Sequence, residues 1–407
     1  MRITRWQRNH TMVFLACVMS VSIIAIVFIR LSMNQFNDTV ADFEEEMFRR
    51  QLSQLAHIQQ SRYRDVRDES PPVLRAIHVA ALDRERMKTQ GCVADGLLSG
   101  YGNEERNIAL INRLGCYYLH RAVETWLRVP DWEMVELLMA KITRPNMVYG
   151  MFIAEAIDTT SRYKNTLTGK RFSFKRMCKP GTRNRWGKRT CVPDFDRSEY
   201  RAYVTQIMRE AIDHGIQVFL IGQVAVQDAR RVERSDIESV LTAVRKYADA
   251  RGVEIMIGAQ TNDITDKDYL RLFDFIEGGV GLHPDGSIED GPCFSRYLAQ
   301  NWCWALVWHE RYARKAPAVF VHLDWSGIRD DDMATFVQMS PDKRSQTLRY
   351  LHSFFTERGV GFLLPVFAAL PQEHPGCYGN KKRYYSADKR YGCADEDTIR
   401  SILLTNQ

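Results

Sequence analysis

From residue 146 onward, short apolar runs alternate with longer amphipathic stretches. The runs are rich in β-branched and aromatic residues, and they read MVYGMFIAEAI, QVFLIGQ, VEIMIGAQ, DFIEGGVGL, AVFVHLDW and VGFLLPVF. The stretches between most of them, such as RSEYRAYVTQIMREAIDHG, place apolar residues at helical spacing and end in glycine. Strands that alternate with helices predict a parallel sheet covered on both faces. We therefore expect an α/β fold over residues 146–407.

A TIM-like (β/α) barrel is the expected form of this sheet. Six apolar runs are clear, whereas such a barrel has eight strands, so two strands are hidden or the sheet is open. No GxGxxG follows the first run and no GxxxxGK[ST] occurs anywhere, which counts against the dinucleotide and P-loop uses of an open sheet. No cofactor is predicted.

The residues before 146 suggest a membrane-tethered arrangement. Residues 1–10 carry three arginines, and residues 11–29 contain no charge and are long enough to cross a bilayer as a signal anchor. Polar residues 30–72 indicate a helical stalk, and residues 73–145, which include CYYLHRAVETWLRV and WEMVELLMAKI, indicate a small helical subdomain. The arginines predict a cytoplasmic N-terminus, with the bulk of the protein periplasmic, lumenal or extracellular.

The cysteines agree with an oxidising compartment. Outside the predicted span there are eight, an even number that favours disulfides over a zinc site because no CxxC or HxxxH spacing accompanies them. Sequence leaves the connectivity open. Pairing neighbours in order is the working model, giving Cys92–Cys116, Cys178–Cys191, Cys293–Cys303 and Cys377–Cys393.

Chemistry in parallel sheets collects where strands end. Three acids occupy such places and are the candidate catalytic residues: Glu155, Glu277 and Asp324. Amide, imidazole and indole side chains at strand ends are candidate substrate ligands, namely Gln223, Gln260, Asn262 and, beside Asp324, His322 and Trp325. This set of side chains predicts a sugar site. The acids would transfer protons and attack the sugar, the amides would bind its hydroxyl groups, and the indole ring would stack on its face. Each acid also has a structural interpretation as an ion-pair or turn residue.

Two segments concentrate positive charge beside aromatic rings. Residues 159–193 hold eleven Lys and Arg with no acid, and the second segment is CYGNKKRYYSADKRYGC at 377–393. We expect two disulfide-pinned flaps on one side of the barrel mouth, whose candidate ligands for an anionic chain are Arg183, Arg185, Trp186, Lys188, Arg189, Tyr384 and Tyr385. Solvated loops are the alternative. Nucleic acid would satisfy the same charges, but an exported protein favours an anionic polysaccharide, glycolipid or lipid headgroup.

Other hydrolytic sites fit less well. His283 and His322 with Asp324 could hold a metal, but their spacing is not diagnostic and no metal site is predicted. A GxSxG motif is absent, and the paired cysteines argue against a thiol nucleophile.

The strand-end acids with aromatic neighbours resemble the (β/α)-barrel glycoside hydrolases over about residues 146–370, and the layout resembles membrane-tethered members that trim exopolysaccharide during export. The resemblance implies Glu277 as acid/base, Asp324 or Glu155 as nucleophile or base, and an export complex as a partner. The chain departs from the commonest clan at Glu277, where Ile276 stands in place of the asparagine of an Asn-Glu pair.

Two rival classes share parts of this layout. A lumenal type II glycosyltransferase would have the same tail, span and stalk, and would want a strand followed by Asp-x-Asp, for which RDDDM at 329–333 is the nearest match. A non-catalytic polysaccharide-binding barrel would keep the flaps and make the acids incidental.

Overall fold

The computed structural model describes residues 79–100, 104–228, 236–260, 267–288, 318–324, 331–369, 384–390 and 392–405. The chain divides into two compact units. The first comprises Met1–Leu74 and Asn184–Lys188, of which only the latter segment is described; the second comprises Arg75–Arg183 and Arg189–Gln407. The fold below is that of the second unit.

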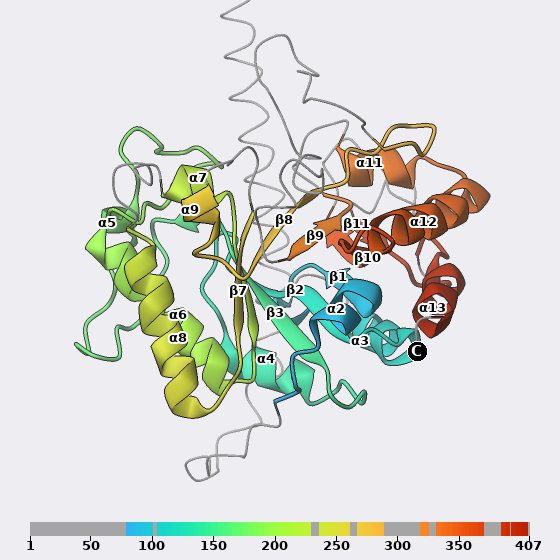
Figure 1. Cartoon of the computed structure of the whole chain (residues 1–407). Coiled ribbons are helices and arrows are strands. Elements are labelled where there is room, and N and C mark those ends of the chain that lie inside the picture. Colours follow the sequence, from blue (N-terminus) through green and yellow to red (C-terminus); the bar gives the residue numbers. More distant parts are fainter. Residues whose placement is uncertain are drawn as a thin grey trace, which may run out of the picture. The chain divides into compact units, whose positions relative to one another are not determined.

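Eight parallel strands close into a TIM-like barrel (Figure 1). In spatial order they are β1 (Gly91–Ala94), β2 (Tyr118–Glu124), β3 (Val148–Ile153), β6 (Val218–Ile221), β7 (Met256–Gln260), β8 (Phe275–Gly279), β9 (Val319–His322) and β10 (Gly361–Ala369). Closure comes from parallel pairing of β1 with β10, in which Cys92 lies opposite Leu364. A short strand, β11 (Tyr384–Ser386), adds antiparallel to β10.

The two hidden strands lie in the region expected to be a helical subdomain, so the boundary at residue 145 is wrong. β1 and β2 belong to residues 73–145, and β2 occupies half of the run CYYLHRAVETWLRV that was interpreted as helical. Every residue of β2 is buried, since it lies between the barrel interior and the surrounding helices. A strand buried on both faces loses the apolar–polar alternation that identifies strands, and its periodicity no longer separates it from a helix. The helix expected at WEMVELLM is confirmed.

Helices cover the outside of the barrel. Their bounds are α2 (Arg84–Gln90), α3 (Glu104–Leu114), α4 (Trp132–Met139), α5 (Phe174–Met177), α6 (Ser198–Asp213), α7 (Val224–Gln227), α8 (Glu238–Arg251), α9 (Lys267–Leu270), α11 (Asp332–Val337), α12 (Pro341–Thr356) and α13 (Glu396–Thr405), with a 3-10 turn at Leu97–Ser99. α8 ends where the sequence predicts, because Gly252 takes a left-handed φ of 65° that L side chains disfavour. α12 begins with the Ser340 side chain accepting the Lys343 amide proton.

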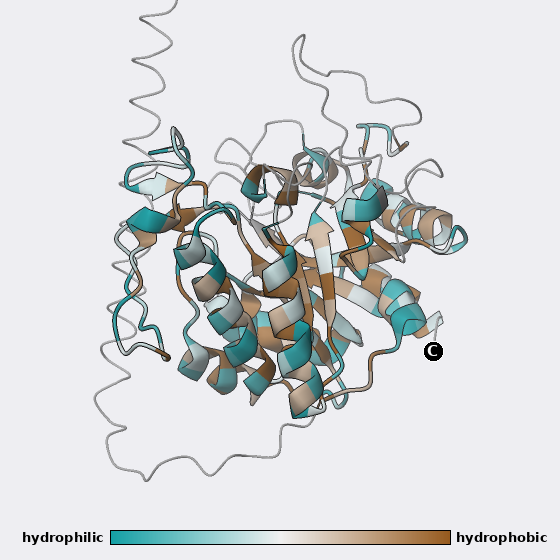
Figure 2. Ribbon diagram, turned by 60° about the vertical axis from the view of Figure 1, so that its left-hand side comes forward, coloured by the Kyte–Doolittle hydropathy of each residue, from teal (hydrophilic) through white to brown (hydrophobic). Residues whose placement is uncertain are grey.

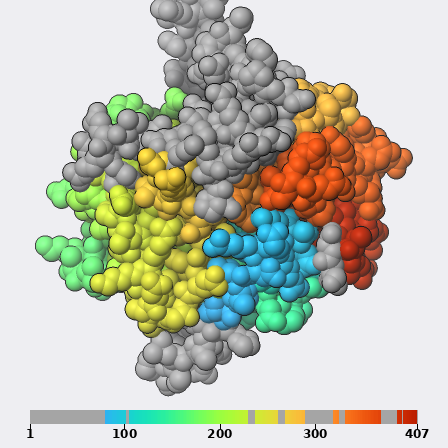
Figure 3. All heavy atoms as spheres, in the orientation of Figure 1, coloured from blue at the N-terminus to red at the C-terminus, as the bar shows by residue number. Residues whose placement is uncertain are grey.

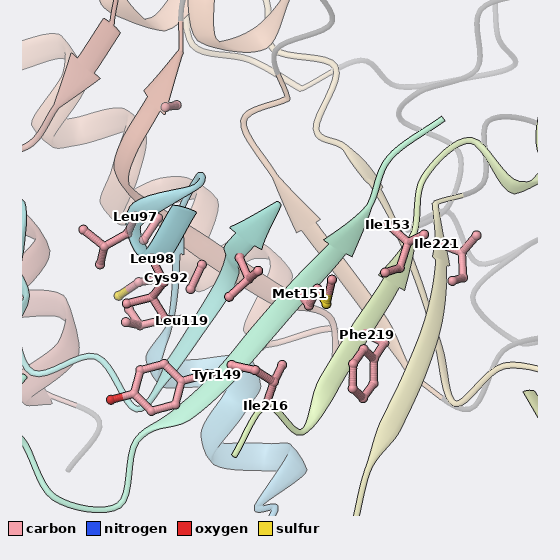
Figure 4. Packing of buried hydrophobic residues seen from close by; sticks show 14 of the residues in the cluster. Cys92, Leu97, Leu98, Leu119, Tyr149, Met151, Ile153, Ile216, Phe219 and Ile221 are labelled. Carbon is pink, nitrogen blue, oxygen red and sulfur yellow. The ribbon is translucent and has the colours of Figure 1, made fainter. Parts of the chain in front are cut away.

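Two apolar layers stabilise the barrel. Between strands and helices, strand residues such as Leu119, Met151 and Phe219 pack into one large buried cluster (Figure 4). Figure 2 shows hydrophilic residues along the outward faces of the helices and hydrophobic residues concentrated within. A second cluster, which includes Phe275 and Phe320, comes from the alternate strand positions and fills the barrel interior. Gly258 makes room there, because an added Cβ would lie 2.2 Å from the Phe275 ring.

The barrel also joins distant parts of the chain. α2 lies against α12 and β10, and Figure 3 shows this N-terminal segment (blue) beside the C-terminal part of the chain (orange). His352 of α12 has its Nε2 3.0 Å from the Thr89 carbonyl oxygen.

Two of the four expected disulfides are confirmed. Cys92–Cys116 joins the start of β1 to the residues before β2, and Cys178–Cys191 closes the first flap, where β4 (Ile157–Asp158) pairs with β5 (Thr190–Cys191). Cys393 is disulfide-bonded, while Cys377 and the expected Cys293–Cys303 pair lie outside the described residues.

The predicted tail, span and stalk (residues 1–72) also lie outside the described residues. Among the helices that the structure does describe, none is both long and apolar enough to cross a bilayer.

Candidate active site at the barrel mouth

The alternation of strand residues brings polar groups into the barrel above its aromatic layer. Phe275 and Phe320 face each other inside the barrel with ring centroids 5.3 Å apart. Since side chains two residues apart point to the same side of a strand, Glu277 on β8 and His322 on β9 also point inward, one layer nearer the carboxyl ends. Asp324, two residues beyond His322, continues the same inward row.

Glu277 and His322 form a buried ion pair at the centre of the site. Oε1 of Glu277 contacts Nε2 of His322, and the two side chains are 0% and 1% exposed. The same His322 nitrogen lies 3.7 Å from Oδ1 of Asp324, so one imidazole faces two carboxylates. A second imidazole approaches the same carboxylate oxygen: Nε2 of His120 lies 3.7 Å from Oε1 of Glu277, and its Nδ1 lies 2.7 Å from the Tyr118 hydroxyl.

This contact fixes the charges of the pair. Burial by itself would raise the pKa of Glu277, but the charge of His322 and hydrogen bonding from His120 and His322 outweigh it and hold that pKa well below its usual range. Burial would lower the pKa of His322, but Glu277 and Asp324 raise it to about 9. Glu277 is therefore a carboxylate and His322 an imidazolium at neutral pH.

Glu155 lies beyond the end of β3 and is held by the side chain of Gln223, which Gln260 holds in turn. Its Oε1 accepts a 2.7 Å hydrogen bond from Nε2 of Gln223, and the Gln223 backbone amide donates to Oε1 of Gln260 at 3.1 Å. Gln223 adopts a left-handed φ of 34°, a conformation that costs free energy for a residue with a side chain and is here tied to this contact network. The buried Oε2 of Glu155 has no hydrogen-bond partner among the described residues.

The two acids at the rim both hold protons more tightly than usual. Burial, reinforced by the nearby charge of Asp324, raises the pKa of Glu155 to about 7. Burial also raises the pKa of Asp324 to about 6, with the charge of Glu277 adding to the shift and that of His322 opposing it. The three predicted acids thus form one electrostatic cluster in which each has a different proton affinity.

Arg121 is the main functional candidate that sequence reasoning missed. Its guanidinium carbon lies 4.1 Å from the centroid of the Phe152 ring, with Nε 3.2 Å from Oδ1 of Asp95 and Nη2 2.8 Å from Oε1 of Glu124. Its φ of 57° accompanies a register shift between β2 and β3, which is the signature of a β-bulge that redirects a side chain. The signal in the sequence was a His-Arg pair inside an apolar run.

The acids of RDDDM that the structure describes have structural partners. Asp332 accepts hydrogen bonds from the backbone amides of Val280 and Leu282 at 2.7 Å and from that of Asp324 at 3.3 Å, so it ties the ends of β8 and β9 together. Asp331 caps α11. Among the described residues, no group of three or more His, Cys, Asp or Glu side chains is arranged to hold a metal ion.

The structure therefore brings together six of the predicted site residues, namely Glu155, Gln223, Gln260, Glu277, His322 and Asp324. Asn262 and Trp325 lie outside the described residues, as does the side chain of Tyr384. Tyr385 was wrongly expected to contact substrate: it is fully buried and its hydroxyl donates to Oδ2 of Asp395 at 3.0 Å.

In the first flap most cationic side chains are exposed, whereas two phenylalanine rings are buried. Arg183 and Arg189 are exposed, whereas Phe172 and Phe174 pack edge-on against Tyr203 of α6 with centroids 5.6 and 5.1 Å away. These phenylalanine rings anchor the flap to the outside of the barrel. Arg185, Trp186 and Lys188 belong to the other unit, in which the Arg185 guanidinium lies 5.8 Å from the Trp186 ring centroid.

The sequence matches no protein-family model and no curated relative. Among solved structures, the chain is similar to a GH27 β-L-arabinopyranosidase from Geobacillus stearothermophilus (10% identity, TM-score 0.41, 79% of this chain and 77% of that one). It is also similar to Eubacterium rectale Amy13B (11% identity, TM-score 0.45, 83% of each chain) and to the Nostoc punctiforme debranching enzyme (10% identity, TM-score 0.42, 83% of this chain and 76% of that one). At these values the likeness carries no assignment of activity or substrate.

Proposed function

We propose that the barrel is a glycoside hydrolase in which Glu155 is the general acid and Asp324 is its ionised partner. The observation that carries the proposal is the position of two buried acids at the ends of β3 and β9, close enough for their charges and that of Arg121 to act on one another. Burial raises the pKa of Glu155 to about 7 and that of Asp324 to about 6. Between these two pKa values the first acid is mostly protonated and the second mostly ionised. A protonated and an ionised carboxyl group facing one bond is the requirement of glycoside cleavage.

Glu277 takes a different role from the acid/base role that the resemblance implies. It is fully buried, and its pKa lies far below neutral, so it has no proton to donate and no access to a sugar. Its contact with His322 instead keeps an imidazolium 3.7 Å from Asp324. We assign Glu277 as the residue that keeps His322 charged, and His322 as the positioning residue whose charge favours the ionised form of Asp324.

The reaction follows from these positions. Gln223 holds Oε1 of Glu155 and leaves the unpartnered Oε2 to carry the proton, which passes to the leaving glycosidic oxygen as the bond to the anomeric carbon breaks. Asp324 then either attacks the anomeric carbon or takes a proton from an attacking water. Either course stabilises the positive charge that develops on the sugar ring.

The substrate we propose is an anionic polysaccharide or glycoconjugate met outside the cytoplasm. The disulfides Cys178–Cys191 in the flap and Cys92–Cys116 in the barrel are typical of an oxidising compartment. The exposed flap cations Lys175, Arg176 and Arg183 favour an anionic chain. Tethering by residues 11–29 and a role in envelope polysaccharide synthesis or export belong to the same proposal.

Product analysis of single variants tests the assignment. The parent should release new reducing ends from an anionic glycan, while Glu155→Gln and Asp324→Asn should lose several orders of magnitude in kcat with little change in binding. Asp285→Asn is the matched control, because Asp285 is an exposed acid in the connection after β8. Azide added to Asp324→Gly should restore turnover as a glycosyl azide if Asp324 is the nucleophile.

Three results would overturn parts of this proposal. Full activity in both amide variants would remove Glu155 and Asp324 from the reaction. Binding of a glycan by the parent without any cleavage would make the protein a binding module. Sugar transfer that depends on a nucleotide donor would make it a transferase.

A further inference from the structure

The segment between β4 and α5 forms a rigid hairpin. Lys164 and Arg171 pair as an antiparallel bridge, and the chain between them turns at Asn165. The carbonyl of Asn165 accepts the amide proton of Gly169 at 2.8 Å, and its side-chain oxygen accepts those of Leu167 and the following residue, each at 3.0 Å. The tip, residues 165–169, is therefore ordered by its own hydrogen bonds.

The tip presents a leucine to solvent. Leu167 is 87% exposed, far more than the other exposed large hydrophobic residues among those described, which are Leu137, Tyr350 and Leu404 at 46–54%. A single apolar residue on a surface is common and by itself needs no partner. The surroundings of Leu167 make it unusual.

Cations flank this leucine on both strands of the hairpin. Arg162, Lys164, Lys170 and Arg171 are all exposed, and no ion pair with a described acid involves any of them. The nearest acid on α6, Glu210, already accepts hydrogen bonds from Tyr163, Trp132 and Gln206. The hairpin thus presents an apolar tip between two strands whose exposed cations form no ion pair with a described acid.

The hairpin is fastened to the outside of the barrel, away from the mouth. The Thr166 amide donates to Oε1 of Gln206 at 3.0 Å, and Nε2 of Gln206 donates to the Lys164 carbonyl at 2.9 Å. Gln206 lies in the middle of α6, and Figure 1 shows the connection that leads into α5 beside this helix. These cations therefore do not share the mouth with the acids, contrary to the expectation for the whole flap.

We propose that hairpin 164–171 is a contact site for an anionic lipid bilayer, into which Leu167 inserts at the headgroup boundary while Lys164, Lys170 and Arg171 contact lipid phosphates. An apolar side chain surrounded by cations matches an interface that is apolar within and negative at its surface. An anionic polysaccharide would satisfy the cations but offers no hydrocarbon for an aliphatic tip. The proposal is independent of glycoside cleavage.

Environment-sensitive fluorescence on the full-length chain tests this contact. A nitrobenzoxadiazole label on Leu167→Cys, corrected for labelling of the parent cysteines, should brighten and shift to the blue on vesicles containing about one third phosphatidylglycerol, and much less on phosphatidylcholine alone. Leu137→Cys on α4 is the matched control: Leu137 is also exposed but has Glu133 and Glu136 as neighbours on its helix, and its label should not respond.

Charge reversal supplies the second arm. Replacing Lys164, Lys170 and Arg171 with Glu should lower the partition coefficient of the labelled hairpin on anionic vesicles by about fivefold or more per cation. High salt should lower the same coefficient. No response of the 167 label to either lipid would overturn the proposal, as would an equal response at position 137. A response to a soluble anionic polysaccharide in place of lipid would overturn it in favour of a glycan site.

Discussion

The barrel mouth and the first flap (residues 159–193) are both rich in charge but differ in how that charge is compensated. In the mouth, Glu277 and His322 are buried and in contact, and Arg121 lies between two carboxylates. In the flap, ten of the eleven cations are exposed, and the segment contains no acid. The flap is held instead by a disulfide and by phenylalanine rings packed on α6.

The difference shows which charges affect the stability of the fold. Buried charges interact strongly, shift one another's pKa values and destabilise the protein when one partner is removed. Exposed charges are screened by salt and contribute little to stability, which leaves them available for an anionic partner. Substitutions in the two regions should therefore have effects of very different size and kind.

The largest effect on stability is expected from breaking the central ion pair. Glu277→Gln removes the nearer of the two carboxylates that face the buried His322 imidazolium and should lower the free energy of unfolding by about 3–5 kcal/mol near pH 5. The cost should be smaller at pH 9, where His322 can lose its proton. Denaturant unfolding at the two pH values measures both, and the double variant with His322→Gln should recover part of the loss. Equal destabilisation at both pH values would contradict the ion pair.

The two disulfides should differ because they close loops of different length, with sequence separations of 24 and 13 residues. Cys92 and Cys116 are almost fully buried beside the first two barrel strands, so replacing both with Ser should cost about 2–5 kcal/mol in the free energy of unfolding. The Cys178–Cys191 disulfide closes a shorter loop, so replacing both cysteines should lower the free energy of unfolding by less. The same replacement should make residues 170–190 more sensitive to limited proteolysis. Denaturant midpoints and cleavage maps of the two double variants test this order.

The mouth should also make stability depend on pH. The pKa values of Glu155, Asp324 and His322 are raised in the folded state, so these three groups bind more protons in the folded protein than in the unfolded chain between about pH 4 and 9. The part of the free energy of unfolding that these groups control should fall as pH rises through about 6, 7 and 9. The His322 portion, between about 6.5 and 9, should be absent in His322→Gln; an unchanged profile there would remove His322 as its source.

The smallest effect on stability is expected in the flap. Changing Lys175, Arg176 and Arg183 to Gln together should alter the free energy of unfolding by no more than about 0.5 kcal/mol per site, because all three are exposed. The same variant should bind an anionic polysaccharide more weakly at low salt, with little difference at high salt. A large loss of stability would mean that these cations have structural partners.

Site residues were easier to predict from the sequence where the strand that carries them has clear boundaries. Glu277 and His322 were placed correctly because β8 and β9 are bounded by clear glycine and polar signals. Arg121 and His120 were missed because β2 is buried along its whole length and reads like a helix. Tyr385 was assigned to a surface because its neighbours in sequence are charged, whereas its own pairing in β11 turns it into the core.

The sequence by itself determined the alternation of strands and helices, the local excess of cations at 159–193 and the strand-end positions of the acids, since these depend on spacing along the chain. Only the tertiary structure decided which carboxyl group is charged. Glu277, Asp324 and Glu155 look equivalent in sequence, yet Glu277 contacts an imidazolium, Asp324 lies 3.7 Å from it and Glu155 meets an amide. Proton affinity follows burial and neighbouring charge, and both exist only once distant strands have closed into the barrel.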